Sequence, residues 1–212
     1  LFENEERNKE AAVLPCLRQQ KEKVEIPYYL SLSDYLPPEE SEIKDYLGFF
    51  AVTGGIGAAD AVKKIAGEDD YLRIMVKTLS DRLAEALAEY LHLKVRTEYW
   101  PYAPDESLSV EEILRVKYRG IRPAPGYQAC PDHREKELIF NLLEAEKNIG
   151  ISLTDSRMMV PEASVCGYYF AHPESKYFSV GKIALDQVMD YAERRNEARE
   201  VTEKWLNSIL AY

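Results

Sequence analysis

The sequence lacks an apolar run close to the roughly 20 residues that a membrane-spanning helix needs. Its first ten residues, LFENEERNKE, are mostly charged or polar and contain no apolar core of a signal peptide. Basic residues are outnumbered, 27 Lys and Arg against 37 Asp and Glu, and they are scattered rather than gathered in a stripe. We therefore predict a cytoplasmic domain that binds neither membranes nor nucleic acid.

Cysteine is also scarce, with three residues in 212. Cys16, Cys130 and Cys166 are too few, and odd in number, for a disulfide framework, so we predict reduced thiols. Cys130 and His133 form half of a zinc-like pattern or a Cys–His nucleophile pair. We favour a third interpretation, in which Asp132 simply begins the next helix as its N-cap.

The remaining composition is that of a globular domain, since 46% of the residues are hydrophobic. Strands and helices alternate irregularly, which favours the α+β class over a doubly wound parallel sheet. Strands are predicted within 25–36, 45–55 and 163–183, the last as two strands joined by HPES. Helices are predicted at 58–67, 69–95, 109–118, 132–148, 186–195 and 201–210.

The longest predicted helix, 69–95, carries two faces. Leu72, Met75, Leu79, Leu83, Leu87, Tyr90 and Leu91 recur every three or four positions and form one apolar stripe. Lys77, Asp81, Glu85 and Glu89 lie four apart on another face. Carboxylates and amines at this spacing are typical of a solvated helix surface, which is the interpretation we favour for them.

The glycines of FFAVTGGIGAAD follow a predicted strand and precede a helix, as in a dinucleotide-binding turn. The fingerprint requires Gly or Ala at its sixth position, where this sequence has Asp60. An acidic side chain there would repel a pyrophosphate at the helix N-terminus. We therefore favour an ordinary glycine turn.

The stretch RGIRPAPGYQACPDH, residues 119–133, is the least ordinary in the chain. Pro123 and Pro125 fix the backbone on both sides of Ala124, and Gly126 can adopt the positive φ of a sharp turn. From the residues alone this is a stiff loop, which either connects two elements or presents Arg122 to a ligand.

RPAPGY and the downstream SKYF together resemble the C-terminal activation domain of cobalamin-dependent methionine synthase. The resemblance extends over essentially the whole chain. It also includes LRQQ (17–20), FAVTGG (50–55), LSDRLAEALAEYLH (79–92), SKYFSVGKI (175–183), DQVMDYAERR (186–195) and VTEKWLNSILAY (201–212). It implies a single, curved α+β domain over 1–212, with a twisted antiparallel sheet flanked by helices.

The resemblance also implies a function. Domains of this family bind S-adenosylmethionine and support the reductive methylation of cob(II)alamin, which reactivates the parent methyltransferase for methionine biosynthesis. The implied partners are the cobalamin-binding module of that enzyme and flavodoxin or a related flavoprotein. Methyl transfer from a sulfonium to cobalt moves no proton, so the lack of an evident general acid or base is compatible with this role.

Seven residues are implied as binding residues for S-adenosylmethionine. They are Glu85, Arg122, Ala124, Gly126, Tyr127, Tyr177 and Phe178. Arg122 would pair with the carboxylate of the ligand, and Tyr127 would lie between the ligand and the corrin. No catalytic acid or base and no metal ligand is implied for this chain.

Several motifs of the parent enzyme are missing from this sequence. The motifs of the homocysteine, folate and cobalamin modules are not in it, so we expect a piece of a longer protein that is inactive alone. An aspartate in an earlier stretch of the family domain helps to hold the amino group of the ligand, and no residue here replaces it. A non-catalytic module that docks on a corrinoid protein or a flavoprotein is the alternative.

Overall fold

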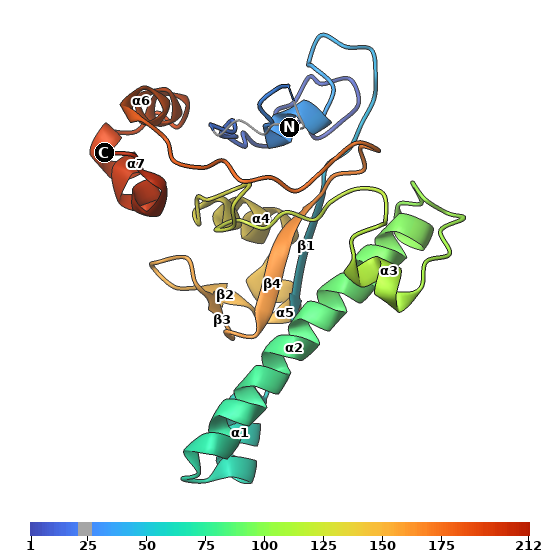
Figure 1. The fold of residues 1–212 in the computed structure, drawn as a ribbon, viewed down its shortest axis with the longest axis vertical. Coiled ribbons are helices and arrows are strands. Elements are labelled where there is room, and N and C mark those ends of the chain that lie inside the picture. The colour runs from blue at the N-terminus through green and yellow to red at the C-terminus, as the bar shows by residue number, and fades with distance from the viewer. Residues whose placement is uncertain (21–26) are drawn as a thin grey trace.

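The computed structural model describes residues 1–20 and 27–212, and it confirms the α+β class (Figure 1). The helices are α1 (Ala58–Ala66), α2 (Asp70–Lys94), α3 (Val110–Leu114), α4 (Glu135–Leu143), α5 (Ala145–Ile149), α6 (Leu185–Arg194) and α7 (Arg199–Leu206). Short 3-10 turns are η1 (Leu32–Tyr35) and η3 (Asn207–Ile209), and η2 (Val95–Tyr99) is a π-helical turn that continues α2. The strands are β1 (Gly48–Thr53), β2 (Ser152–Leu153), β3 (Met159–Val160) and β4 (Ser164–Tyr169).

The sheets are small and antiparallel. β1 pairs with β4, with Phe50 opposite Gly167, and β2 pairs with β3. Both α2 and α4 contact the β1–β4 pair, which places the main core around these two strands. Tyr168 and Phe170 are almost fully buried there. The helices α6 and α7 pack on each other at one end of the molecule, where the C-terminus lies (Figure 1).

Two strand predictions are wrong. Residues 175–183 form no strand, and β4 pairs with β1 instead of with this segment. The segment is held by isolated hydrogen bonds, in which Val180 N–H donates to the carbonyl of Gln128 and Gln20 N–H donates to the carbonyl of Val180, and by a bridge between Ile183 and Leu210. The predicted strand within 25–36 lies partly outside the described residues, and its later part is the turn η1.

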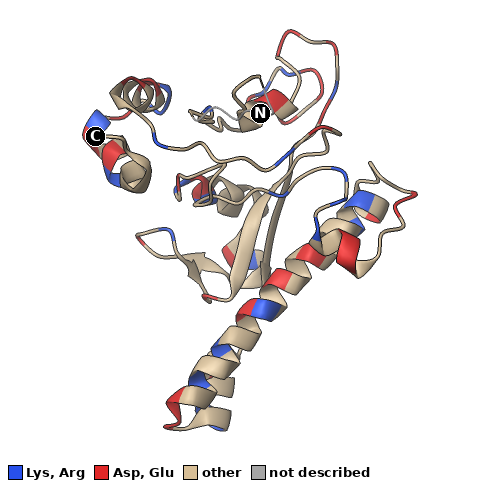
Figure 2. Cartoon of the chain, viewed as in Figure 1, with Lys and Arg blue, Asp and Glu red and all other residues tan. Residues whose placement is uncertain are grey.

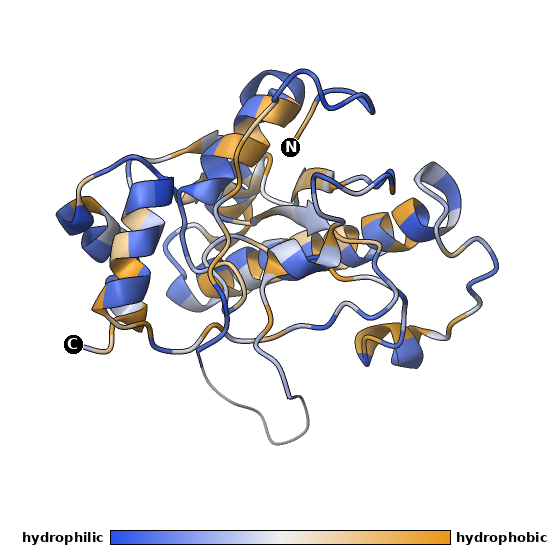
Figure 3. Ribbon diagram, turned by 90° about the horizontal axis from the view of Figure 1, so that it is seen from above, coloured by the Kyte–Doolittle hydropathy of each residue, from blue (hydrophilic) through white to orange (hydrophobic). Residues whose placement is uncertain are grey.

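Helix α2 is confirmed, but its apolar stripe is not its buried face. The buried side chains of α2 are Ser80, Ala84, Ala88 and His92, whereas Leu79, Leu83 and Leu87 are exposed. Small residues face the sheet because β1 and the turn after it approach the helix backbone closely: a Cβ on Gly54 would lie 2.7 Å from the carbonyl oxygen of Ser80. Apolar and polar positions therefore alternate along the visible surface of α2 (Figure 3).

The predicted helix at 132–148 is broken into α4 and α5 at Glu144, whose φ is 44°. Asp132 is not its N-cap. The Asp132 carboxylate is buried and accepts hydrogen bonds from the backbone N–H and the guanidinium of Arg134. This buried ion pair extends to Glu197, which fastens the start of α4 to the turn between α6 and α7.

Charges of both signs are spread over the ribbon, and both signs occur along α2 (Figure 2). In the described residues, no helix is both long and apolar enough to cross a membrane.

Candidate functional site

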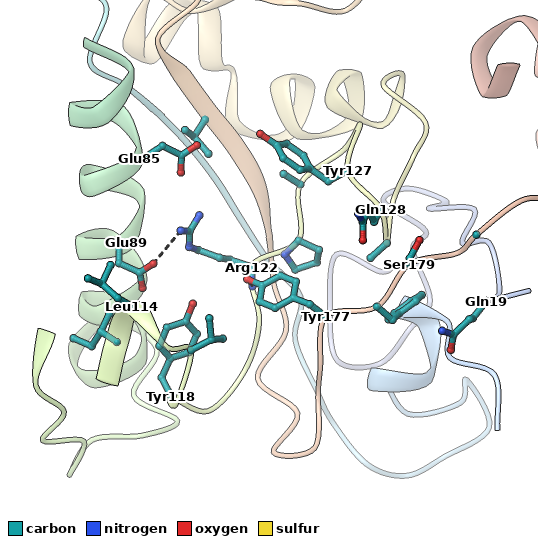
Figure 4. A pocket seen from close by; sticks show the side chains of 18 residues that line it. Gln19, Glu85, Glu89, Leu114, Tyr118, Arg122, Tyr127, Gln128, Tyr177 and Ser179 are labelled. Atoms are coloured by element: carbon teal, nitrogen blue, oxygen red, sulfur yellow. Dashed lines mark hydrogen bonds and ion pairs between the residues drawn. The ribbon is translucent and has the colours of Figure 1, made fainter. Parts of the chain in front are cut away.

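A pocket of about 960 Å³ lies beside α2, and the stiff loop forms much of its wall (Figure 4). Five parts of the chain contribute to its lining. These are Gln19 near the N-terminus, Glu85 and Glu89 of α2, several residues between 113 and 129 from α3 through the loop, Val165 of β4, and residues from the 177–181 segment. The segments LRQQ, RPAPGY and SKYFSVGKI, which are far apart in the sequence, thus meet at one cavity.

The loop is rigid because backbone hydrogen bonds fix it along β4, on the edge that does not pair with β1. Ile121 and Phe170 exchange two backbone hydrogen bonds of 3.0 Å, and the Pro123 carbonyl accepts a third from Tyr168. Proline has no N–H to donate, so its carbonyl is the group that can join this ladder. Gly167 makes the close approach feasible, since a Cβ there would lie 2.6 Å from the Pro123 oxygen.

Arg122 lies at the centre of the pocket, and both of its ends are held. Its backbone N–H donates to the hydroxyl of Tyr177 at 2.9 Å, and its Nη2 donates to Oε2 of Glu89 at 3.0 Å. The two charged side chains are 18% and 22% exposed. Burial by itself would lower the pKa of Arg122, but the hydrogen bond and charge of Glu89 raise it above its usual value. Arg122 is therefore a fixed cation at the pocket wall.

A layer of buried polar side chains lies behind this wall. Arg96 pairs with Glu106 at 2.7 Å and stacks 4.0 Å from the centre of the Tyr118 ring. His92 stacks on Tyr169 and contacts the hydroxyl of Tyr102 at 3.0 Å.

Burial, together with the positive charges of Arg96 and Arg122, lowers the pKa of His92 to about 2. The imidazole is therefore neutral and adds no charge beside the cation of Arg122.

Aromatic rings form the rest of the pocket. Tyr118 is buried, Tyr177 is partly exposed, and Tyr127 is 67% exposed where the pocket meets solvent. Phe178 contributes to the lining, although most of its side chain belongs to the hydrophobic core. A pocket that combines a fixed guanidinium with several aromatic faces is suited to an organic ligand that carries both a carboxylate and a cationic centre.

Six of the seven predicted binding residues line this pocket: Glu85, Arg122, Ala124, Tyr127, Tyr177 and Phe178. Gly126 lies in the same loop but does not line the cavity. Its φ is +94°, and a Cβ at this position would lie 2.3 Å from the ring of His133. Gly126 therefore shapes the loop rather than the pocket surface.

The interpretation of Glu89 as part of a solvated helix face is wrong, because its carboxylate binds Arg122 inside the pocket. Tyr118, Gln19 and Ser179 are further lining residues that the sequence did not indicate. The i, i+4 spacing of Glu85 and Glu89 is the same for a solvated face and for a pocket wall. The sequence therefore held no local signal that distinguishes the two.

The part of the chain that the structure describes contains no group of three or more His, Cys, Asp or Glu side chains that could hold a metal ion. His133 contacts the ammonium of Lys136 through Nδ1 at 2.7 Å. Cys130 is a free, buried thiol whose pKa is raised by burial, which makes it a poor nucleophile. Neither a metal site nor a Cys–His pair is therefore supported here.

Two comparisons place these features among known proteins. A family model described as "Vitamin B12 dependent methionine synthase, activation domain" matches residues 1–196. A crystal structure of "the MetH Reactivation Domain bound to AdoHcy" is similar to this chain, with a TM-score of 0.94 and 51% sequence identity. That similarity covers 100% of this chain, which spans 65% of the length of the crystallised chain.

Proposed function

This chain belongs to the family of vitamin B12-dependent methionine synthase activation domains, and on that basis we propose that its Arg122 pocket binds S-adenosylmethionine for reactivation of the parent enzyme. The observation that carries the proposal is a partly buried, fixed guanidinium in a pocket lined by aromatic rings. The related reactivation domain was crystallised with AdoHcy, the demethylated form of the same ligand, which supports the ligand class.

Arg122 is proposed to bind the carboxylate of the ligand. A guanidinium carries five N–H donors, and the ion pair with Glu89 uses Nη2. Other donors remain for a second carboxylate, and charge-assisted bonds of this kind are about twice as strong as neutral ones. Ala124, held between two prolines, lines the same pocket, and its backbone is proposed to contact the amino-acid end of the ligand.

The sulfonium is proposed to lie against an aromatic face, and the ring of Tyr177, which lines the pocket and is 43% exposed, is the one we propose. Such a contact contributes roughly 0.5–2 kcal/mol. Glu85 is an exposed carboxylate on the same pocket, and its negative charge favours a cation nearby. Tyr127, which is largely exposed at the rim, is proposed to lie between the bound ligand and the corrin.

The reaction itself needs positioning more than acid–base chemistry. When cob(I)alamin is presented to this pocket, its cobalt would supply the electron pair that bonds to the methyl group, the S–CH₃ pair would stay on sulfur, and no proton would move. Cobalamin would be supplied by another module of the parent enzyme, and the electron that forms cob(I)alamin by flavodoxin or a related flavoprotein. This chain contributes a rigid pocket that holds the methyl donor.

Isothermal titration calorimetry with S-adenosylmethionine tests the proposal, with Arg122→Ala as the matched variant. We expect saturable binding to the unmodified chain and at least a tenfold loss of affinity in Arg122→Ala, about 1.4 kcal/mol or more. If the unmodified chain releases no heat, the alternative of a non-catalytic docking module is favoured. If Arg122→Ala binds normally, Arg122 is not the carboxylate partner.

A further inference from the structure

The Arg122–Glu89 pair is only half satisfied. Nη2 of Arg122 meets Oε2 of Glu89, but Nε of Arg122 and Oε1 of Glu89 are both buried and have no hydrogen-bond partner among the described residues. The pair joins α2 to a loop 33 residues further along the chain. A buried ion pair normally gains its stability by using more of its donors and acceptors, so this geometry needs an explanation.

The backbone of Arg122 is already fixed before a ligand binds, whereas its side chain is not fixed by the loop itself. Its backbone is fixed by Tyr177, by the proline that follows and by the pairing of the loop with β4. The long side chain is the remaining source of freedom, and a free Arg loses roughly 2 kcal/mol of rotamer entropy when it is ordered. The contact with Glu89 removes that freedom before a ligand arrives, and the single hydrogen bond leaves the other guanidinium donors unused.

We infer that Glu89 is the positioning residue of this site: it holds the Arg122 guanidinium toward the pocket, ready to receive the carboxylate of S-adenosylmethionine. The inference rests on the proposed function and assigns Glu89 a role through Arg122, not a contact with the ligand. Figure 4 shows the two side chains directed toward each other, with Glu85 on the same helix, one turn away. Glu85 lines the same pocket but has no ion pair among the described residues, which makes it the matched control.

A double-mutant cycle measured by calorimetry tests this role. Glu89→Gln should weaken S-adenosylmethionine binding about tenfold, whereas adding it to Arg122→Ala should cause no further loss, because its effect depends on the guanidinium. Glu85→Gln should instead combine additively with Arg122→Ala. Glu89→Asp keeps the charge but is one methylene too short, so it should also weaken binding.

A ligand variant separates positioning from structural damage. Decarboxylated S-adenosylmethionine keeps the sulfonium and the amine but has no carboxylate for Arg122. It should therefore bind the unmodified chain and Glu89→Gln equally, and a damaged pocket would weaken it as well.

Three results would overturn the inference. The first is that Glu89→Gln still weakens binding in the Arg122→Ala background or with the decarboxylated ligand. The second is that Glu89→Gln binds S-adenosylmethionine as tightly as the unmodified chain, and the third is that Glu89→Asp does. The first would mean that Glu89 acts without Arg122, either by touching the ligand itself or by supporting the structure of the pocket. A failure of the unmodified chain to bind S-adenosylmethionine would contradict the proposed function instead, so the two failures are distinguishable.

Discussion

At the scale of single residues, the conformation of the binding loop depends on the space that neighbouring side chains leave at Gly126. Gly126 combines a positive φ with direct contact to the ring of His133, which is itself held by Lys136. Two independent constraints therefore act on a residue that does not touch the pocket. Substitutions here test whether the loop is as rigid as its prolines and backbone hydrogen bonds indicate.

Gly126→Ala is expected to lower the free energy of unfolding by about 2–3 kcal/mol, because the new methyl group is both sterically crowded and on a disfavoured backbone conformation. Urea denaturation measures this loss. In a His133→Ala background the crowding is relieved, and the cost of Gly126→Ala should fall to about 1 kcal/mol, the backbone part alone. An identical cost in both backgrounds would show that the His133 ring is irrelevant.

His92 predicts how stability responds to pH. Its pKa is about 2 in the folded chain and about 6.5 in the unfolded chain. Its contribution to the free energy of unfolding is therefore complete above pH 6.5 and declines as the pH falls. When the pH is lowered from 7 to 5, this group alone should reduce the free energy of unfolding by about 2 kcal/mol. His92→Phe, which can still stack on Tyr169, should remove that part of the pH dependence. Urea denaturation of both proteins at both pH values measures this change. An equal loss of stability in the two proteins would contradict the prediction.

At the scale of elements, the packing of α2 on the sheet decides where the pocket lies. Glu85 and Glu89 reach the pocket because the neighbouring face of the helix, with Ser80, Ala84 and Ala88, lies against the strands and the turn after β1. The helix approaches closely only because its buried side chains are small and Gly54 has none. A larger residue at this contact would move the carboxylates as well as the helix.

Gly54→Ala should therefore destabilise the chain by about 1–3 kcal/mol, because its methyl group would meet backbone atoms of α2 that cannot rotate away. It should also weaken S-adenosylmethionine binding, since α2 carries Glu89. Gly57→Ala is the control: nothing lies within 4 Å of its Cβ position, but φ is +76°, so it bears backbone strain alone. Thermal unfolding and calorimetry compare them, and equal losses of affinity would count against the packing explanation.

At the scale of the whole molecule, the pocket joins parts of the chain that lie far apart in the sequence. Gln19, α2, the loop and the 177–181 segment all line it, so a ligand that binds there should stabilise the entire fold. This effect is independent of any catalytic assay. It also reports on the chain without the other modules of the parent enzyme.

S-adenosylmethionine at 100 times its dissociation constant should add about 2.7 kcal/mol to the free energy of unfolding. For a domain of this size, that corresponds to a rise in the melting temperature of roughly 5–10 °C. Differential scanning fluorimetry measures the shift, and Arg122→Ala at the same ligand concentration should show a much smaller one. A shift that is equal in both proteins would place the ligand elsewhere.

Local signals predicted much of the fold. The strand at 48–53, the long helix and the start of α3 all follow from periodicity and end residues within a few positions. The break at Glu144, the failed strand at 175–183 and the inverted face of α2 do not. The last two depend on partners that are distant in the sequence, Gln128 for Val180 and Gly54 for α2.

The sequence by itself determined the family, the stiffness of the RPAPGY loop and the residues expected at the ligand, because proline, glycine and motif identity act locally or are shared among relatives. Only the tertiary structure decided that Glu89 faces Arg122 and that the leucines of α2 face solvent. A helical spacing specifies which residues share a face, but the side on which the sheet packs decides whether that face meets water, a core or a ligand.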